Sequence, residues 1–583
     1  MDIFKKKITA LLYDILKSSQ HSDNFTKEFI YELITIPPNL DMGDYSFPCF
    51  KLAKFLRKKP DAIAKDLADH INKLITEVKE IVAVNSIGPY INFKISYQYM
   101  ASITLPKVLS GEYFNYHSKK KKKVMIEYSQ PNTHKGFHVG HIRNVALGDC
   151  LCNIFKYNGY DVIAANYIGD AGAHVAKCLW YYMNRNSESP PAAMKGEWLG
   201  ALYSKATNLL NNSAPDEKKL YEKEISNILK GLENGDLKLK NIWEKTKNWS
   251  LEDFNKIYDW LNTKFDRVFY ESEVDNEGKH LILEYCNKGV FEKSQGAIGI
   301  DLNDVDLGYF LLLKSDGNTL YSTKDIALAI KKFKEYEIDQ SIYIVGAEQI
   351  LHLKQVFETL KRMGYDKASD CFHLPYSLVK IPSGKMSSRV GNVILFTQLR
   401  DNMSKFINEN YLSKFKTIWN KDEIEETTRR ISIAAIKYGM LKTDTNQDII
   451  FSIDDWLVSE GNTGVYLVYA YVRIMSIGEK IKGELSSDVD YKLLSDPNEK
   501  ILIRYIYDFN EIVTLACEQY KPSVLTNYLF NLAKAFNRAY KECSVKNAES
   551  MELQAARWFL FYCVGQVLKK GLKLSGIIPP NRM

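Results

Sequence analysis

The sequence feature that most constrains the fold is a strand–loop–helix–strand pattern between residues 124 and 168. Residues 124–129 form a short apolar run typical of a buried parallel strand, and a helical pattern follows at 142–157. Gly159 then breaks the helix before a second apolar run at 162–168. This spacing is that of a βαβ unit, whose crossover is expected to be right-handed. The pattern predicts a parallel sheet with a ligand at the carboxyl end of its first strand.

Later segments predict the rest of this sheet. Strand-like runs return at 308–313, 341–345 and 377–381, separated by helical patterns at 323–335 and 353–363, which fits the second half of a doubly wound sheet. Charged helical patterns such as 216–232 and 251–265 fill residues 185–305, so we expect an insertion there. Beyond about residue 400 the pattern is almost wholly helical.

The first 118 residues predict a small mixed domain, with helices at 47–57 and 61–75 and strands at 81–84 and 90–95. The lysine run 119–123 then marks a boundary. A solvated linker is the favoured interpretation of this run, and contact with a phosphate backbone is the alternative.

Composition excludes several classes. A chain of 583 residues is longer than one hydrophobic core usually organises, so we expect several domains. Its net charge of +7 is lower than that of a strongly basic nucleic-acid binder. Nine cysteines without a C-x-x-C pair suit neither a disulfide framework nor a zinc knuckle. No apolar run is long enough for a membrane span, and the first residues predict an amphipathic helix with no signal peptide. We therefore expect a cytoplasmic protein with reduced thiols.

The loop after the first strand carries the main candidate site. His138 and His141 open the helix three residues apart, and the helix N-terminus between them favours anions. Gly140 lets a ligand approach the backbone, and the imidazoles can donate hydrogen bonds to phosphate oxygens. Two alternatives stay open at this point: surface histidines without a role, or a metal site that includes His134.

The segment HVGH, followed much later by KMSSR, resembles the HIGH and KMSKS signatures of class I aminoacyl-tRNA synthetases. The second signature comprises Lys385, Met386, Ser387 and Ser388. Longer segments narrow the resemblance to the arginyl-tRNA synthetases: IEYSQPNTHKGFHVGHIRNVALGD, ANYIGDAG, KSDGNTLYSTKDIA, IYIVGAEQILHLKQ and the terminal PPNRM. The resemblance covers nearly the whole chain and is weakest in the insertion and in parts of the N-terminal domain.

The resemblance implies a multidomain α/β and all-α architecture. A small α+β domain at 1–118 would bind the tRNA elbow, and a Rossmann-type (HUP) catalytic domain at 119–400 would contain the insertion at about 185–305. A helical connection at 401–455 would lead to an anticodon-binding helical bundle at 456–583.

A pocket for arginine needs carboxylates, because the guanidinium keeps its charge and binds a carboxylate through parallel hydrogen bonds. Glu127 interrupts an apolar strand, and a buried charge needs a partner. Asp325 follows Tyr321 by one helical turn, although a charge at a helix start explains it equally well. By resemblance, Glu127, Tyr321 and Asp325 form the guanidinium pocket, while Asn132 and Gln349 hold the amino acid's polar groups.

The implied reaction forms arginyl-adenylate from ATP with Mg²⁺, without zinc, and then transfers arginine to the terminal ribose of tRNA(Arg). His138 and His141 would contact the phosphates and Lys385 the pyrophosphate. The residues expected beside the adenylate are Gly169, Asp170 and Gly172.

The sequence departs from the family pattern in two places. Ser388 replaces the second lysine of KMSKS, and Lys135, just before HVGH, would take over its role. Ala171 and His174 replace the commoner Trp and Gln after GD, which leaves the role of His174 open.

Distant residues would contact the tRNA, on which arginine activation generally depends in this family. Tyr90 and Asn92 would bind an unpaired base, although Tyr90 also suits a β-core. The anticodon candidates are Tyr466, Arg473, Tyr540 and Met583. We expect a monomer. The competing hypotheses are another class I synthetase, a non-catalytic tRNA-binding relative, and a nucleotidyltransferase with an HxGH motif.

Overall fold

The computed structural model of the chain describes residues 2–17, 25–39, 42–75, 78–115, 122–381, 384–385, 393–481 and 485–583. The chain divides into two compact units. One contains Met1–Asn115, Arg473–Ile512 and Asn531–Leu568, and the other contains Tyr116–Val472, Val513–Phe530 and Lys569–Met583. The parallel sheet predicted from the sequence lies wholly in the second unit.

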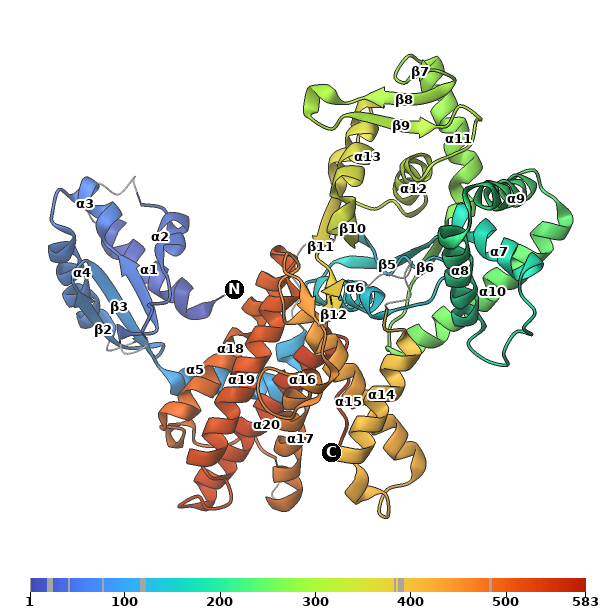
Figure 1. The fold of residues 1–583 in the computed structure, drawn as a ribbon. Helices are drawn as coiled ribbons and strands as arrows, with labels where there is room; N and C mark the ends of the chain where they lie inside the picture. The colour runs from blue at the N-terminus through green and yellow to red at the C-terminus, as the bar shows by residue number, and fades with distance from the viewer. Residues whose placement is uncertain are drawn as a thin grey trace. The chain divides into compact units, whose positions relative to one another are not determined.

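Within the described residues the main sheet has five strands, and each neighbouring pair is parallel (Figure 1). Its order is β11-β10-β4-β5-β6, with bounds Lys123–Glu127 (β4), Asp161–Ile168 (β5), Arg267–Tyr270 (β6), Gln340–Gly346 (β10) and Cys371–Tyr376 (β11). β4 lies in the middle, which explains its buried apolar run. The chain adds β5 and β6 on one side of β4 and then β10 and β11 on the other. Ligands of such sheets bind at the carboxyl ends of the strands where this direction reverses.

Helices connect these strands and cover the sheet. α6 (Val139–Tyr157) joins β4 to β5, and α13 (Ile350–Arg362) joins β10 to β11. The helices between β5 and β6 are α7 (Ala173–Asn184), α8 (Lys195–Asn212), α9 (Pro215–Glu233) and α10 (Leu237–Trp260). Between β6 and β10 lie α11 (Glu271–Asn287), α12 (Tyr321–Tyr336) and the antiparallel strands β7 (Glu292–Ser294), β8 (Ala297–Asp301) and β9 (Tyr309–Leu313). Met125, Ala165 and Phe269 of the sheet pack with Val274 of α11 and Leu328 of α12 in one apolar cluster.

The sheet differs from its sequence prediction in three places. The expected insertion at about 185–305 is interrupted, because β6 at Arg267–Tyr270 pairs with β5 inside it. The strand predicted at 308–313 exists as β9, but it belongs to the separate antiparallel sheet. The final parallel strand is β11, whereas 377–381 contributes β12 (Val379–Ile381) to a small sheet with β13 (Gly384–Lys385) and β14 (Ile449–Ile450). Short, partly exposed strands lack the apolar run that marks β4.

The C-terminal helices agree with the helical pattern beyond residue 400. They are α14 (Phe396–Asn410), α15 (Lys421–Leu441), α16 (Ile453–Leu457), α17 (Gly464–Ile481), α18 (Pro497–Glu518), α19 (Pro522–Glu542) and α20 (Met551–Leu574). A search of the described helices found none with the length and hydropathy of a bilayer-spanning segment.

The first 115 residues form an antiparallel sheet in the order β1-β3-β2 with flanking helices. The elements are α1 (Ile3–Lys17), α2 (Lys27–Leu33), β1 (Tyr45–Pro48), α3 (Phe50–Leu56), α4 (Pro60–Leu74), β2 (Ile81–Ile87), β3 (Tyr90–Ile95) and α5 (Tyr97–Ser110). The helix predicted at 47–57 begins late, because Phe47 and Pro48 pair with β3. Ile8 and Leu12 of α1 are fully buried, as an amphipathic helix requires.

Candidate active site

A cleft of about 580 Å³ lies at the carboxyl ends of β4 and β10, where the sheet topology places a ligand. The predicted site residues that line this cleft are Glu127, Asn132, His138, Gly140, His141, Gly169, Tyr321, Asp325 and Gln349. The structure therefore brings together side chains that come from distant segments of the chain.

The N-terminus of α6 fixes the tautomers of both signature histidines. His138 is the N-cap residue, and its Nδ1 accepts a hydrogen bond from the Gly140 N–H at 3.2 Å. Nδ1 of His141 accepts the His138 N–H, also at 3.2 Å, which completes a capping box. Because each Nδ1 is an acceptor, each neutral ring carries its proton on Nε2. Both Nε2–H groups are thus left as donors beside the cleft.

These histidines are neutral at physiological pH. Burial, with the charge of Lys135 as a smaller cause, lowers the pKa of His138 to about 4. Burial also holds the pKa of His141 well below its usual range, with His138 and Lys135 as smaller causes. Lys135 does not line the cleft, and its Nζ lies 5.3 Å from the ring centroid of Tyr203 on α8. Its charge nevertheless acts on both imidazoles.

Glycine is required at two cleft positions by close packing. A Cβ at Gly140 would approach the His138 ring to 3.0 Å, so this glycine seats the imidazole in its capping position. A Cβ at Gly169 would overlap the Asn132 side-chain oxygen. Asn132 and Gly169 form a parallel bridge that extends β4 and β5 to the rim of the cleft. The predicted adenylate-side glycine therefore also positions the predicted amino-acid contact.

Three carboxylates of the opposite wall, those of Glu127, Glu271 and Asp325, have a cationic or imidazole partner. Glu127 forms an ion pair with the fully buried Lys332 and accepts a hydrogen bond from Gln130 at 2.8 Å. The sequence argument that a buried Glu127 needs a partner is confirmed, and the partner is a residue that sequence reasoning missed. Asp325 accepts a hydrogen bond from His352 Nε2 at 2.6 Å.

Glu271 lines the same cleft and was missed by the sequence analysis. It is the first residue of α11, only 5% exposed, and its carboxylate pairs with Lys324 at 3.3 Å. Burial raises the pKa of Glu271 to about 7, Lys324 opposes this shift, and Asp325 adds to it. The signal that could have found Glu271 is its position directly after β6, which the expected insertion concealed.

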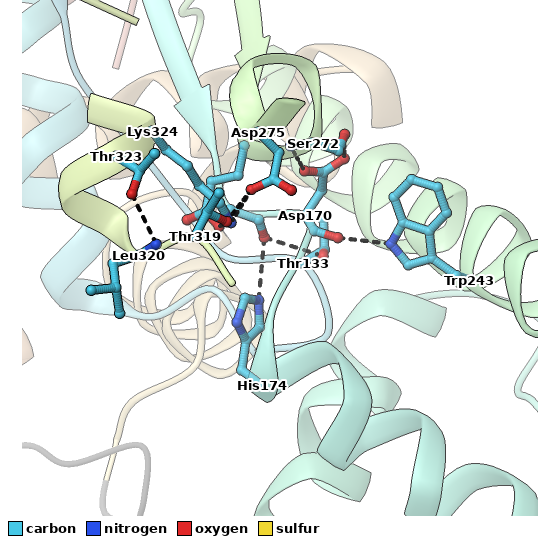
Figure 2. A network of polar contacts seen from close by, with 12 residues as sticks. Thr133, Asp170, His174, Trp243, Ser272, Asp275, Thr319, Leu320, Thr323 and Lys324 are labelled. Carbon is cyan, nitrogen blue, oxygen red and sulfur yellow. Dashed lines mark hydrogen bonds and ion pairs between the residues drawn. The ribbon is translucent and has the colours of Figure 1, made fainter. Parts of the chain in front are cut away.

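Asp170 and Gly172 do not line this cleft, but Gly172 lines an adjoining cavity that shares Glu271 and Tyr321 with it. The Asp170 carboxylate is fully buried and accepts hydrogen bonds from the Ser272 N–H at 2.9 Å and the Ser272 hydroxyl at 2.7 Å. Figure 2 shows Asp170 between Ser272 and Trp243, whose indole N–H donates to the Asp170 carbonyl. Asp170 therefore anchors the start of α11 and, through it, the adjacent Glu271.

Two other histidines have structural contacts. His134 uses both ring nitrogens on hydroxyls, those of Thr133 at 2.9 Å and Thr246 at 2.8 Å. Both ring nitrogens are therefore already engaged, and the part of the chain that the structure describes holds no cluster of metal-ligating side chains. His174 Nε2 lies 3.3 Å from the carbonyl oxygen of Gly169, a residue of the cleft wall (Figure 2).

The second signature lies partly outside the described residues. Lys385 belongs to β13, which pairs with β12 through Lys380, whereas Met386, Ser387 and Ser388 are not among the described positions. α6 holds the chain on both sides of this signature. Arg143 donates to the carbonyls of Ser377 and Leu378, and the His138–Leu395 bridge holds the other side.

Comparison with known families decides the assignment. The family model for "tRNA synthetases class I (R), catalytic domain" matches residues 104–453. An arginyl tRNA synthetase N-terminal domain matches residues 2–95, and a DALR anticodon binding domain matches residues 467–583. The chain belongs to the arginyl-tRNA synthetase family. The resemblance inferred from the signatures is confirmed, as is the predicted architecture of an α/β catalytic domain with a small N-terminal domain and a C-terminal helical domain.

Relatives of the chain cover its full length. An arginine–tRNA ligase of Bdellovibrio bacteriovorus is 39% identical over 100% of this chain and 99% of its own length. One from Clostridium botulinum is 36% identical over 100% of both. The Thermus thermophilus arginyl-tRNA synthetase structure has a TM-score of 0.79 at 24% identity, covering 99% of this chain and 100% of its own. At this identity the structural likeness supports the fold alone.

The residues predicted to contact an unpaired tRNA base differ in exposure. Tyr90 is 41% exposed and packs edge-on against the exposed Phe50, with ring centroids 5.6 Å apart. Asn92 is only 3% exposed, in contrast to the contact expected of it. The reason is its place on the central strand, where Ser46 and Asn85 flank it.

The residues predicted to contact the anticodon differ in their neighbours and in their exposure. Arg473 donates to the Asn537 side-chain oxygen at 2.8 Å and lies 5.3 Å from the ring centroid of Tyr540, which is 40% exposed. Tyr466 packs against Phe530, with ring centroids 5.7 Å apart. Met583 is half-buried. The structure thus brings together Arg473 and Tyr540.

Proposed function

We propose that this chain is an arginine–tRNA ligase, which activates L-arginine with ATP and transfers it to tRNA(Arg). The observation that carries this proposal is one cleft with neutral imidazole donors on one wall and carboxylates on the other. The imidazole wall suits the phosphates of ATP, and the carboxylate wall suits a guanidinium. Family membership supports the same reaction.

In the first step, the carboxylate of arginine attacks the α-phosphorus of ATP. A P–O bond forms to the arginine, the bond to the β-phosphate oxygen breaks, and pyrophosphate leaves with that electron pair. His138 and His141 donate their Nε2–H groups to phosphate oxygens as charge accumulates, and Lys385 and Lys135 supply positive charge on the pyrophosphate side. The Met386–Ser388 segment completes the pyrophosphate side, and Gly169 adjoins the adenylate.

Mg²⁺ enters as part of the ATP substrate. Because Glu127, Glu271 and Asp325 are paired with Lys332, Lys324 and His352, the phosphates and water are the natural ligands of this ion. In the second step, the terminal ribose hydroxyl of the tRNA attacks the carbonyl carbon, and AMP leaves.

In the amino-acid pocket, Asp325, Glu271 and Tyr321 surround the guanidinium. Glu127 completes this guanidinium pocket, and Asn132 and Gln349 bind the amino acid's polar groups. The Asp170 backbone and Gly172 hold the loop behind this pocket.

The tRNA-binding parts of the proposal rest on residues 1–118 and 456–583. Tyr90 offers an exposed ring to an unpaired base, and Arg473 with Tyr540 offers a cation and an aromatic face to the anticodon. Tyr466 and Met583 remain predicted anticodon contacts. We further propose that the protein is cytoplasmic and that it is a monomer. Sedimentation of the purified chain tests the monomeric state.

The replacement Asp325→Asn is expected to raise the KM for arginine about 10–100-fold. The variant keeps the shape of the side chain but loses the charge of a charge-assisted hydrogen bond, which is worth roughly 1.5–3 kcal/mol. The KM for ATP is expected to stay within about twofold, because the histidines bind that substrate. Steady-state exchange kinetics measure both constants, and an unchanged arginine KM would remove Asp325 from the pocket.

Arginine binding is expected to weaken below pH 7. Glu271 has a raised pKa of about 7, so its carboxylate is protonated as the pH falls, whereas the guanidinium prefers the ionised form. The KM for arginine is therefore expected to rise by up to about tenfold per pH unit below 7 and to be flat above it. Glu271→Gln is the control, with a raised KM and no such slope. A wild-type slope retained in this variant would assign the titration to another group.

The proposal is tested by arginine-dependent ATP–pyrophosphate exchange, measured with and without tRNA(Arg). Exchange with arginine alone among the amino acids is the expected result. Exchange with another amino acid would indicate another class I synthetase, and tRNA binding without exchange under either condition would indicate a non-catalytic relative.

A further inference from the structure

Tyr167 is a cleft residue whose hydroxyl group has no role in the reaction described above. It is the penultimate residue of β5, and its ring packs on the apolar cluster of Met125, Ala165 and Phe269. Its hydroxyl oxygen is buried and has no hydrogen-bond partner among the described residues. The same side chain lines the cleft, so the tyrosine has an apolar body in the core and a polar end at the ligand site.

The sheet register places this hydroxyl on the carboxylate wall. Glu127 of β4 pairs with Ala165 of β5, so their side chains share a face, and Tyr167 lies two residues further on that face. Asp325, Glu271 and Glu127 all act electrostatically on the phenol and, after burial, raise its pKa well above 10. The group is therefore a neutral hydroxyl among negative charges.

A cation fits this position better than a phosphate. These three carboxylates already have the partners Lys332, Lys324 and His352, whereas the phenol has a free lone pair. A guanidinium is planar and has five N–H donors and no acceptor. Two carboxylates in that plane do not accept from all five donors, so a further acceptor is needed. A buried hydroxyl without a partner costs free energy in the empty site, and a ligand donor relieves that cost.

We propose that Tyr167 is a further specificity residue, whose hydroxyl oxygen accepts a hydrogen bond from the guanidinium of bound arginine. The inference rests on the proposed function, since it deepens the same pocket. Bound in this way, the phenol O–H donates to a wall carboxylate, and the hydroxyl links substrate and wall.

Tyr167→Phe tests the proposal because it removes only the oxygen. The KM for arginine is expected to rise about tenfold or more, the loss typical of a hydrogen bond to a charged group, with kcat and the KM for ATP within about twofold. The Tm is expected to be unchanged or higher, since the deleted group has no partner in the empty site. Tyr336→Phe is the matched control: Tyr336 packs on the same apolar cluster without lining the cleft, and no kinetic change is expected.

Two competitive inhibitors locate the lost contact. Agmatine keeps the guanidinium and lacks the carboxylate, and its inhibition constant is expected to rise by the same factor as the KM. Norvaline keeps the amino-acid end and lacks the guanidinium, and its inhibition constant is expected to be unchanged. A shift for norvaline alone, or an unchanged arginine KM in an active variant, would overturn the proposal. Absence of arginine-dependent exchange in the wild type would instead overturn the proposed function.

Discussion

His138→Asn is expected to lower the rate of arginine activation by about 10²–10³-fold without destabilising the chain, which is the loss typical of one transition-state donor. The prediction follows from the two functions of this imidazole. Its Nδ1 caps α6 by accepting the Gly140 N–H, and its Nε2–H faces the cleft. Asparagine is among the best N-cap residues, so it replaces the first function, but its short side chain cannot replace the second.

His141→Gln separates the same functions at the other histidine. Glutamine at the third helical position can still reach back to the His138 N–H, as in the usual capping box, while the imidazole donor is lost. A similar loss of rate is therefore expected without loss of stability. His138→Ala is the comparison, because it also removes the cap and is expected to cost about 1 kcal/mol of stability.

Exchange kinetics and urea unfolding measure both effects. Since both pKa values lie far below 7, the activity of the wild type is expected to show no titration of these rings between pH 6 and 9. Full activity in His138→Asn would mean that the histidine serves only as a cap, and the proposed phosphate contact would have to be assigned elsewhere.

The sequence could predict these histidines because their signals are local. A helix N-terminus, a glycine and two histidines lie within four residues, and the apolar run of β4 precedes them. The long, buried strands β4, β5 and β10 were predictable for the same reason. β6 was not, because four partly exposed residues carry no periodic signal, and its position depends on pairing with β5 more than 90 residues earlier.

Because β6 could not be predicted from the sequence, residues of the site that depend on it were missed. Glu271 could not be recognised while β6 was hidden, although it is the carboxylate with the most perturbed pKa on the wall. The partner of Glu127 is Lys332 of α12, which six α-helices and five strands separate from β4 along the chain. Asp170 was predicted beside the adenylate from the family resemblance, and nothing in the sequence indicated that its buried carboxylate accepts hydrogen bonds from the hydroxyl and N–H of Ser272 on α11.

Arg143→Met is expected to destabilise the chain by roughly 3 kcal/mol or more, because it leaves several partly buried carbonyl groups without their donors. Arg143 is fully buried on α6. Its guanidinium donates to the carbonyls of Ser377, Leu378, Asp444, Thr445 and Gln447, at distances from 2.6 to 3.5 Å. Burial lowers its pKa only to about 10, so the cation persists at physiological pH.

Arg143 is also a positioning residue for the second signature. Ser377 and Leu378 directly precede β12, which pairs with the strand that contains Lys385. On the far side of the signature, the Val139 N–H donates to the Ile394 carbonyl at 3.0 Å. α6 therefore carries the signature histidines and holds both sides of the segment that carries the signature lysine. A displacement of about 1 Å between such groups can lower a rate by about 10²-fold.

Arg143→Lys tests the positioning role in a chain that keeps its fold. Lysine retains the charge and up to three donors, but it lacks the planar fork that reaches two groups of carbonyls at once. In this variant, kcat for exchange is expected to fall at least about tenfold while the KM for arginine stays near the wild-type value, because the carboxylate wall is formed by α11, α12 and β4. Urea unfolding at the assay temperature establishes that the variant is folded.

Arg362→Met is the matched control on the surface. Arg362 pairs with Glu358 and Asp304 on the exposed side of α13, and its loss is expected to change stability by less than about 1 kcal/mol with no change in exchange. A folded Arg143→Lys with wild-type kcat would show that the arginine only fills the interior. A parallel rise in the KM for arginine would show that Arg143 supports the whole cleft. Its role would then not be limited to positioning α6 against the strand that contains Lys385.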